Sequence, residues 1–231
     1  MGFTHLISDC DGVLIDSEAL SYVMTADELA SRFPSADRAR DILPLLQPRL
    51  GMLFVPMMVE LSTLLGAPMT LTEIEALHHR VDEAIDRLDT PMPGVGAALA
   101  ATGLPLAVAS NSEARRVRGV LARTGLAPLF HDRVYSGRDL DRPKPAPDVY
   151  LAAAAGFGVA PARCLVVEDS TTGVTAARAA GMTVLGFTGG GHLAPGHGER
   201  LRALGAVATF GHMEELPALV SGLVGMAGKA A

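Results

Sequence analysis

The sequence predicts an α/β fold in which a doubly wound parallel sheet, covered by helices on both faces, carries an inserted helical domain. From about residue 95 to the end of the 231-residue chain, short continuous apolar runs alternate with helical stretches, as in parallel sheets that are buried on both faces. Residues 16–90 instead show helical patterns interrupted by prolines and glycines. We therefore expect a core domain of residues 1–15 and 91–231 and an inserted helical domain of residues 16–90.

The strand candidates are short apolar runs that end at polar residues. The main candidates span residues 3–8, 104–109, 164–167 and 182–187, and weaker ones span residues 133–135 and 206–210. The helical stretches between and after them span residues 112–124, 146–155, 172–180, 198–204 and 213–223. Residues 89–94 have the sequence Asp-Thr-Pro-Met-Pro-Gly, which is typical of a linker that returns the chain to the core.

The charge of the chain limits the classes of partner. The formal net charge is -6 at pH 7, whereas a surface that binds nucleic acid or an anionic membrane is expected to be basic. An anionic substrate must therefore be met by a local positive site. Lys144 and Lys229 are the two lysines of the sequence. Because Lys229 lies in the C-terminal tail, Lys144 is the candidate for that site.

We predict a cytoplasmic protein. Acidic residues occur near the N-terminus before any long apolar stretch, which is unlike a secretory signal. The most apolar window, residues 50–65, is too short to span a bilayer and contains a proline and a glutamate. Cys10 and Cys164 each lie at the end of an apolar run and are expected to be buried free thiols.

Polar residues follow the predicted strands at positions where parallel sheets bind ligands, beyond the carboxyl ends of the strands. Lys144 lies in a connection between two of these strands. Taken singly, each residue has an ordinary explanation as a turn residue, a helix N-cap or a solvated loop lysine. Their joint occurrence at successive strand ends predicts one shared site. The residues at the strand ends are Asp9, Asp11, Ser110, Asn111, Glu168 and Asp169.

The carboxylates of this set suit phosphoryl transfer. A carboxylate such as Asp9 can attack phosphorus and hold the group as an acyl phosphate, which divides one difficult step into two. Magnesium prefers hard oxygen ligands and offsets the repulsion between carboxylates and a phosphate dianion. Asp9, Glu168 and Asp169 can supply such a site. His192 and His197 lack the further ligand-spaced partners that would indicate zinc.

Other side chains would bind the substrate or transfer protons. Lys144 would place a compact positive charge beside the nucleophile and the phosphoryl group. The Ser110 hydroxyl, together with Asn111 and neighbouring backbone N–H groups, could bind phosphate oxygens. Asp11, two residues after the nucleophile, could protonate the leaving oxygen and later deprotonate water. Arg49 could bind substrate from the inserted domain, or it could be a surface helix residue.

These motifs closely resemble those of the haloacid dehalogenase (HAD) superfamily, over the whole chain and including the inserted helices, which correspond to the family's cap domain. The resemblance implies a Rossmann-like core, with Asp9 as nucleophile and Asp11 as acid and base. It further implies magnesium ligands at Asp9, the Asp11 carbonyl and Asp169, and phosphate binding by Ser110 and Lys144. The segments that carry the resemblance are Asp9 to Val13, Ser110, Lys144 to Pro145 and Glu168 to Ser170.

Two longer runs look like the branch of the superfamily that contains β-phosphoglucomutase and many sugar-phosphate phosphatases. Members of this branch often carry a histidine where this chain has Ser21, and a serine does not shuttle protons near neutral pH. This favours hydrolysis of a small phosphorylated metabolite, a sugar or sugar-acid phosphate. A phosphomutase and a catalytically idle binding protein are the alternatives. The runs are Lys-Pro-x-Pro-Asp-Val-Tyr from residue 144 and Val-Val-Glu-Asp-Ser-x-x-Gly from residue 166.

Overall fold

The chain forms two compact units. The computed structural model describes residues 2–33, 37, 41–46, 49, 54–88, 90–190, 193 and 195–228. The first unit comprises Met1–Asp16, Asp89–Gly190 and Pro195–Ala231, and the second has Ser17–Leu88 as its long continuous part. The sequence prediction for His192 lies outside the described residues.

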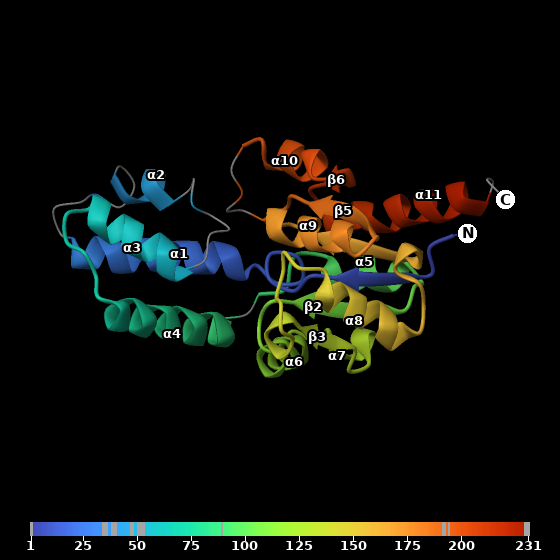
Figure 1. Ribbon diagram of the computed structural model, residues 1–231, viewed down its shortest axis with the longest axis horizontal. Helices are drawn as coiled ribbons and strands as arrows, with labels where there is room; N and C mark the ends of the chain where they lie inside the picture. Colours follow the sequence, from blue (N-terminus) through green and yellow to red (C-terminus); the bar gives the residue numbers. More distant parts are fainter. Residues whose placement is uncertain are drawn as a thin grey trace. The chain divides into compact units, whose positions relative to one another are not determined.

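The first unit is built on a parallel sheet of six strands in the order β3-β2-β1-β4-β5-β6 (Figure 1). From β1 the chain adds β2 and β3 on one side, then returns to place β4 on the other side of β1. The winding therefore reverses between β1 and β4, and the predicted doubly wound fold is confirmed. The strands are β1 (His5–Ser8), β2 (Leu106–Ser110), β3 (Val134–Ser136), β4 (Cys164–Glu168), β5 (Thr183–Phe187) and β6 (Ala206–Phe210).

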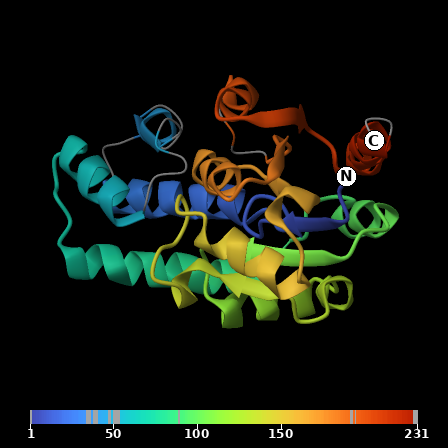
Figure 2. The ribbon, with the colours of Figure 1, turned by 45° about the vertical axis from the view of Figure 1, so that its right-hand side comes forward.

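Helices cover both faces of this sheet (Figure 2). The helices of the first unit are α5 (Val95–Ala101), α6 (Ala114–Arg123), α7 (Ala127–Phe130), α8 (Asp148–Phe157), α9 (Thr171–Ala179), α10 (His197–Ala203) and α11 (Leu216–Gly228). Neighbouring strand residues point to opposite faces. Leu6 packs with residues of α5, α6 and α11, and Ile7 packs with residues of α8, α9 and α10. Burial on both faces explains why the strands are continuous apolar runs.

The element boundaries differ from the sequence prediction in a few places. The sequence patterns did not reveal α5, whose residues are mostly alanine and glycine, or α7, which has 4 residues. The predicted helix at 213–223 begins with a 3₁₀ turn, Met213–Glu215, before α11. β2 begins after Pro105, because proline has no N–H to donate to a strand ladder. The Pro105 carbonyl accepts a hydrogen bond from Leu6 N at 3.0 Å.

The second unit is helical and has its own apolar core. Its helices are α1 (Ser17–Arg32), α2 (Leu43–Leu46), α3 (Phe54–Leu64) and α4 (Leu71–Leu88). Leu29, Met58, Leu61 and Ile74, from three of these helices, are fully buried in that core. Across the part of the chain that the structure describes, no helix combines the length and apolarity needed to cross a membrane.

Candidate active site

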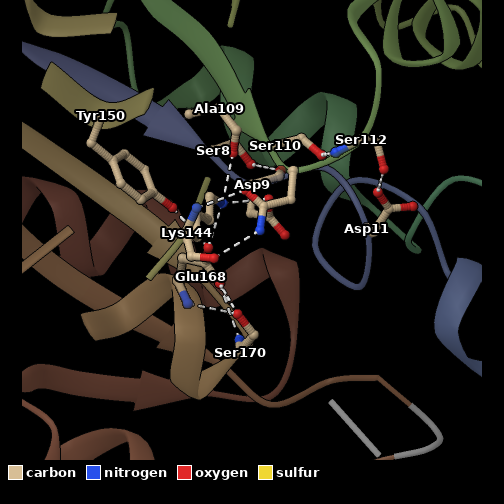
Figure 3. A network of polar contacts seen from close by, with 12 residues as sticks. Ser8, Asp9, Asp11, Ala109, Ser110, Ser112, Lys144, Tyr150, Glu168 and Ser170 are labelled. Atoms are coloured by element: carbon tan, nitrogen blue, oxygen red, sulfur yellow. Dashed lines mark hydrogen bonds and ion pairs between the residues drawn. The ribbon is translucent and has the colours of Figure 1, made fainter. Parts of the chain in front are cut away.

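The polar residues singled out in the sequence gather at the carboxyl edge of the sheet in the first unit (Figure 3). Asp9 directly follows β1, Ser110 is the last residue of β2, and Glu168 is the last residue of β4. Since β1 lies between β2 and β4, these three residues come from neighbouring strands. The winding reverses at this place, where open parallel sheets form ligand sites.

Lys144 links the strand ends through its ammonium group. Its Nζ donates hydrogen bonds to Asp9 Oδ1 at 2.7 Å, to Glu168 Oε1 at 2.7 Å and to the Ala109 carbonyl at 2.8 Å. An ammonium has three donors, so all of them are used. Burial alone would lower the pKa of Lys144, but the charges of Asp9 and Glu168 raise it well above its ordinary value. The side chain is therefore a fixed positive charge beside Asp9.

Asn111 holds the backbone that carries this lysine. Its Nδ2 donates to the Lys144 carbonyl at 3.1 Å, and its Oδ1 accepts from Lys144 N at 2.9 Å. Both ends of the side-chain amide are thus engaged with one residue 33 positions away in the sequence. The sequence predicted a substrate contact for Asn111. In the structure its side chain holds the backbone of Lys144, and its contact with substrate stays a prediction.

Asp9 is a buried carboxylate among other carboxylates. Its exposed fraction is 7%. Burial raises the pKa of Asp9 to about 8, the charge of Glu168 adds to the rise, and Lys144 opposes it. One lysine therefore does not fully balance the negative charge at this position. A second cation beside Asp9 would stabilise the ionised form that nucleophilic attack requires.

Asp11 lies in a separate group of contacts with α6. Its Oδ2 accepts from Ser112 Oγ at 2.8 Å, and its Oδ1 accepts from Arg116 Nη1 at 3.0 Å. Figure 3 shows the Asp11 carboxylate turned toward Ser112 rather than toward Asp9. Arg116 was not among the residues predicted from the sequence. Its place in the first turn of the helix that follows the Ser110 motif was the one available signal.

The carboxylate oxygens of Glu168 each accept two hydrogen bonds. Oε1 accepts from Lys144 Nζ and from the Tyr150 hydroxyl, both at 2.7 Å. Oε2 accepts from Ser170 N and Ser170 Oγ, both at 3.0 Å. On α9, a Cβ added at Gly173 would lie 1.6 Å from Oε1, so the helix backbone closes over the carboxylate. No role was predicted for Tyr150 or Gly173 from the sequence.

The carboxylates fit a divalent cation. One ligand oxygen from each of Asp9, Glu168 and Asp169 can be chosen so that all lie within 4.8 Å of one another. A Cβ added at Gly12, whose φ is +81°, would lie 2.0 Å from Asp169 Oδ2, so this carboxylate rests against the turn that carries Asp9. Hard oxygen donors brought this close are the ligands that magnesium prefers.

Ser110, His197 and Arg49, which were also considered from the sequence, have protein partners in the structure. Ser110 is 2% exposed, and its Oγ accepts from Ser112 N at 3.0 Å. His197 Nε2 lies 2.5 Å from the Asp169 carbonyl and must donate to it, because a carbonyl only accepts. In the second unit, Arg49 pairs with Glu60 at 2.5 Å and donates to the Leu45 carbonyl at 2.6 Å. Its contact with substrate stays a prediction.

Comparison with known proteins identifies similar chains and folds. A family model described as haloacid dehalogenase-like hydrolase matches residues 3–181. Over 212 residues, the chain is 28% identical to 6-phosphogluconate phosphatase of Escherichia coli, and the match covers 91% of each protein.

Two solved structures are similar over nearly the whole chain. A conserved haloacid dehalogenase-like protein of unknown function from Agrobacterium tumefaciens has 35% identity and a TM-score of 0.86, covering 98% of this chain and 100% of that one. A HAD family hydrolase from Deinococcus radiodurans, solved with bound phosphate and sodium, has 31% identity and a TM-score of 0.81, covering 96% of this chain and 98% of that one.

Proposed function

This chain belongs to the haloacid dehalogenase-like hydrolase family, and from that premise we propose that it is a magnesium-dependent phosphatase of sugar or sugar-acid phosphates. The observation that carries the proposal is the buried Asp9 carboxylate, fixed by Lys144 and adjoined by Asp169. A carboxylate held in this way can act as a nucleophile toward phosphorus. The 6-phosphogluconate phosphatase relative supports a sugar-acid phosphate as the first substrate to test.

Asp9, Asp169 and the Asp11 carbonyl would hold the magnesium ion. When bound there, magnesium supplies positive charge that offsets the substrate's phosphate dianion and the protein carboxylates. Lys144 holds Asp9 Oδ1 by a hydrogen bond of 2.7 Å and so restricts the orientation of the attacking carboxylate. The Ser110 hydroxyl and adjacent backbone N–H groups would bind the remaining phosphate oxygens.

The reaction proceeds in two displacements. The Asp9 carboxylate forms a bond to phosphorus as the bond from phosphorus to the leaving oxygen breaks, and Asp11 donates a proton to that oxygen. Asp11 then accepts a proton from water as the water oxygen attacks phosphorus. The bond between phosphorus and Asp9 breaks, and phosphate leaves with Asp9 regenerated. For these transfers, Asp11 must turn away from Ser112 and Arg116, its partners in the structure.

The helical second unit would act as the cap domain and select the substrate. It carries its own core, so its surface residues can vary without disturbing the catalytic edge of the sheet. Arg49 is the candidate for binding substrate oxygens. Because its guanidinium is paired with Glu60, a ligand would have to compete with that carboxylate.

Phosphate release from a panel of compounds tests the proposed function. The panel contains 6-phosphogluconate, hexose and pentose phosphates, and a generic aryl phosphate, each with magnesium or with a chelator. We expect magnesium-dependent release that Asp9→Asn abolishes, with circular dichroism showing that the variant is folded. A folded, magnesium-loaded wild-type protein that releases phosphate from none of these compounds would contradict the proposal. Isomerisation of a sugar phosphate without release would indicate the mutase instead.

A further inference from the structure

Glu168 has its acceptor sites filled by protein donors. A carboxylate offers about four lone-pair sites. Lys144 Nζ and the Tyr150 hydroxyl occupy Oε1, and the backbone N–H and hydroxyl of Ser170 occupy Oε2. The residue is 0% exposed. Glu168 is therefore a buried carboxylate whose lone pairs all accept hydrogen bonds from described residues of the protein.

The surroundings of Glu168 restrict its movement. It ends β4, and the backbone of α9 lies against its carboxylate at Gly173. Ser170, which donates to Oε2, is held in turn as the N-cap of α9, because its Oγ accepts from Gly173 N at 2.9 Å. The side chain is thus bounded by a strand end, by a helix N-terminus and by the hydroxyl of Tyr150.

A direct bond from Glu168 to a cation would require one of these donors to leave. Asp9, Glu168 and Asp169 are close enough to share an ion, but each protein ligand must offer it a lone pair. Loss of the contact with Lys144 would leave a buried carboxylate without its counter-ion, which is costly. The second donor to Glu168 Oε1 is the uncharged hydroxyl of Tyr150, which lies on α8.

We propose that Tyr150 is a positioning residue of this site, whose hydroxyl holds Glu168 as the counter-ion of Lys144 and keeps that carboxylate out of the magnesium coordination shell. The inference rests on the proposed function, since it assumes that a magnesium ion binds beside Asp9. Direct protein ligands are then Asp9, Asp169 and the Asp11 carbonyl. The Tyr150 hydroxyl donates to Glu168 Oε1 at 2.7 Å, because a carboxylate oxygen accepts.

Tyr150→Phe tests this role because it removes the hydroxyl and keeps the ring. Calorimetric titrations without substrate would compare Mg²⁺ and Ca²⁺ binding with the wild type. We expect about threefold tighter Mg²⁺ binding and about tenfold tighter Ca²⁺ binding, since the released oxygen adds a ligand and calcium accepts more oxygen ligands than magnesium. Tyr135→Phe is the matched control, because the Tyr135 hydroxyl lies against Gly156 in the same unit, and it should bind both ions as the wild type does.

Unchanged or weaker metal binding in Tyr150→Phe would overturn the proposal. Weaker binding by about 10- to 100-fold is the result expected if Tyr150 merely orients a carboxylate that binds the ion directly. A crystal structure of the wild-type protein with Mn²⁺ gives a second readout. It should show no Glu168 oxygen within about 2.6 Å of the ion, and a bond at that distance would also overturn the proposal.

The two proposals can fail separately. If the wild type binds magnesium but releases no phosphate, the proposed function fails, while the calorimetric comparison still decides the role of Tyr150. If Tyr150→Phe binds both ions as the wild type does, and the wild type hydrolyses its substrate, only the role of Tyr150 fails. A wild-type protein that binds no magnesium would overturn both.

Discussion

The two units of this protein place their charged residues differently. The first unit buries charge at the carboxyl edge of its sheet. In the described part of the second unit, buried polar side chains are uncharged, and ion pairs such as that of Arg80 with Glu28 lie at the surface. Among the described residues of the first unit, the buried charged ones are Asp9, Lys144, Glu168 and Asp169.

The difference shows that the buried charges, which lower the stability of a fold unless they are paired, are concentrated at the proposed active site. Removing charges from water is unfavourable unless each charge finds partners. In the first unit, Lys144 forms ion pairs with both Asp9 and Glu168. A bound cation would balance the carboxylate charge that this one lysine leaves unpaired. Exposed pairs in the second unit cost little to form and contribute little. Substitutions in the two units should therefore differ widely in their effects.

Lys144→Met should have the largest effect. It leaves Asp9 and Glu168 buried without their shared cation, so we expect the free energy of unfolding to fall by about 3–5 kcal/mol and phosphatase activity to fall by about 100- to 1000-fold. Urea denaturation and phosphate-release assays measure the two losses. Wild-type stability in this variant would show that the buried ion pairs do not hold the edge of the sheet together.

Gly12→Ala should mainly affect metal binding. The new Cβ would lie 2.0 Å from Asp169 Oδ2 at a residue with φ of +81°, so the Asp169 carboxylate must shift from its position. We expect Mg²⁺ affinity to fall by about 10- to 100-fold in calorimetric titrations. Gly103→Ala is the control, because Gly103 has a similar φ of +66° with nothing within 4 Å of its added Cβ. Equal Mg²⁺ affinity in the two variants would argue against this account.

Arg80→Met should have the smallest effect. It removes the exposed ion pair between Arg80 and Glu28, at 2.7 Å in the second unit, and keeps most of the aliphatic side chain. We expect the free energy of unfolding to change by less than about 1 kcal/mol in urea denaturation. If Arg80→Met lowered the free energy of unfolding as much as Lys144→Met, the proposed difference between buried and exposed ion pairs in the two units would be wrong.

Much of the fold and of the site could be predicted from local sequence patterns. Continuous apolar runs indicated the buried strands, and the rule that ligands bind at the carboxyl ends of parallel strands brought Asp9, Ser110 and Glu168 to one edge. The short helices α5 and α7 were missed because neither shows a long amphipathic period. Arg49 as a substrate ligand and the boundaries of the inserted domain stay predictions.

The sequence by itself determined the buried strands, the doubly wound class of the sheet and the set of residue types at its edge, because these follow from periodicity and from residues close together in the chain. Only the tertiary structure decided how the side chains share their hydrogen bonds. Asn111 meets Lys144 across 33 positions, Tyr150 meets Glu168 across 18, and Arg116 meets Asp11 across 105. Such contacts depend on side-chain directions and on the packing of whole elements, which local patterns do not specify.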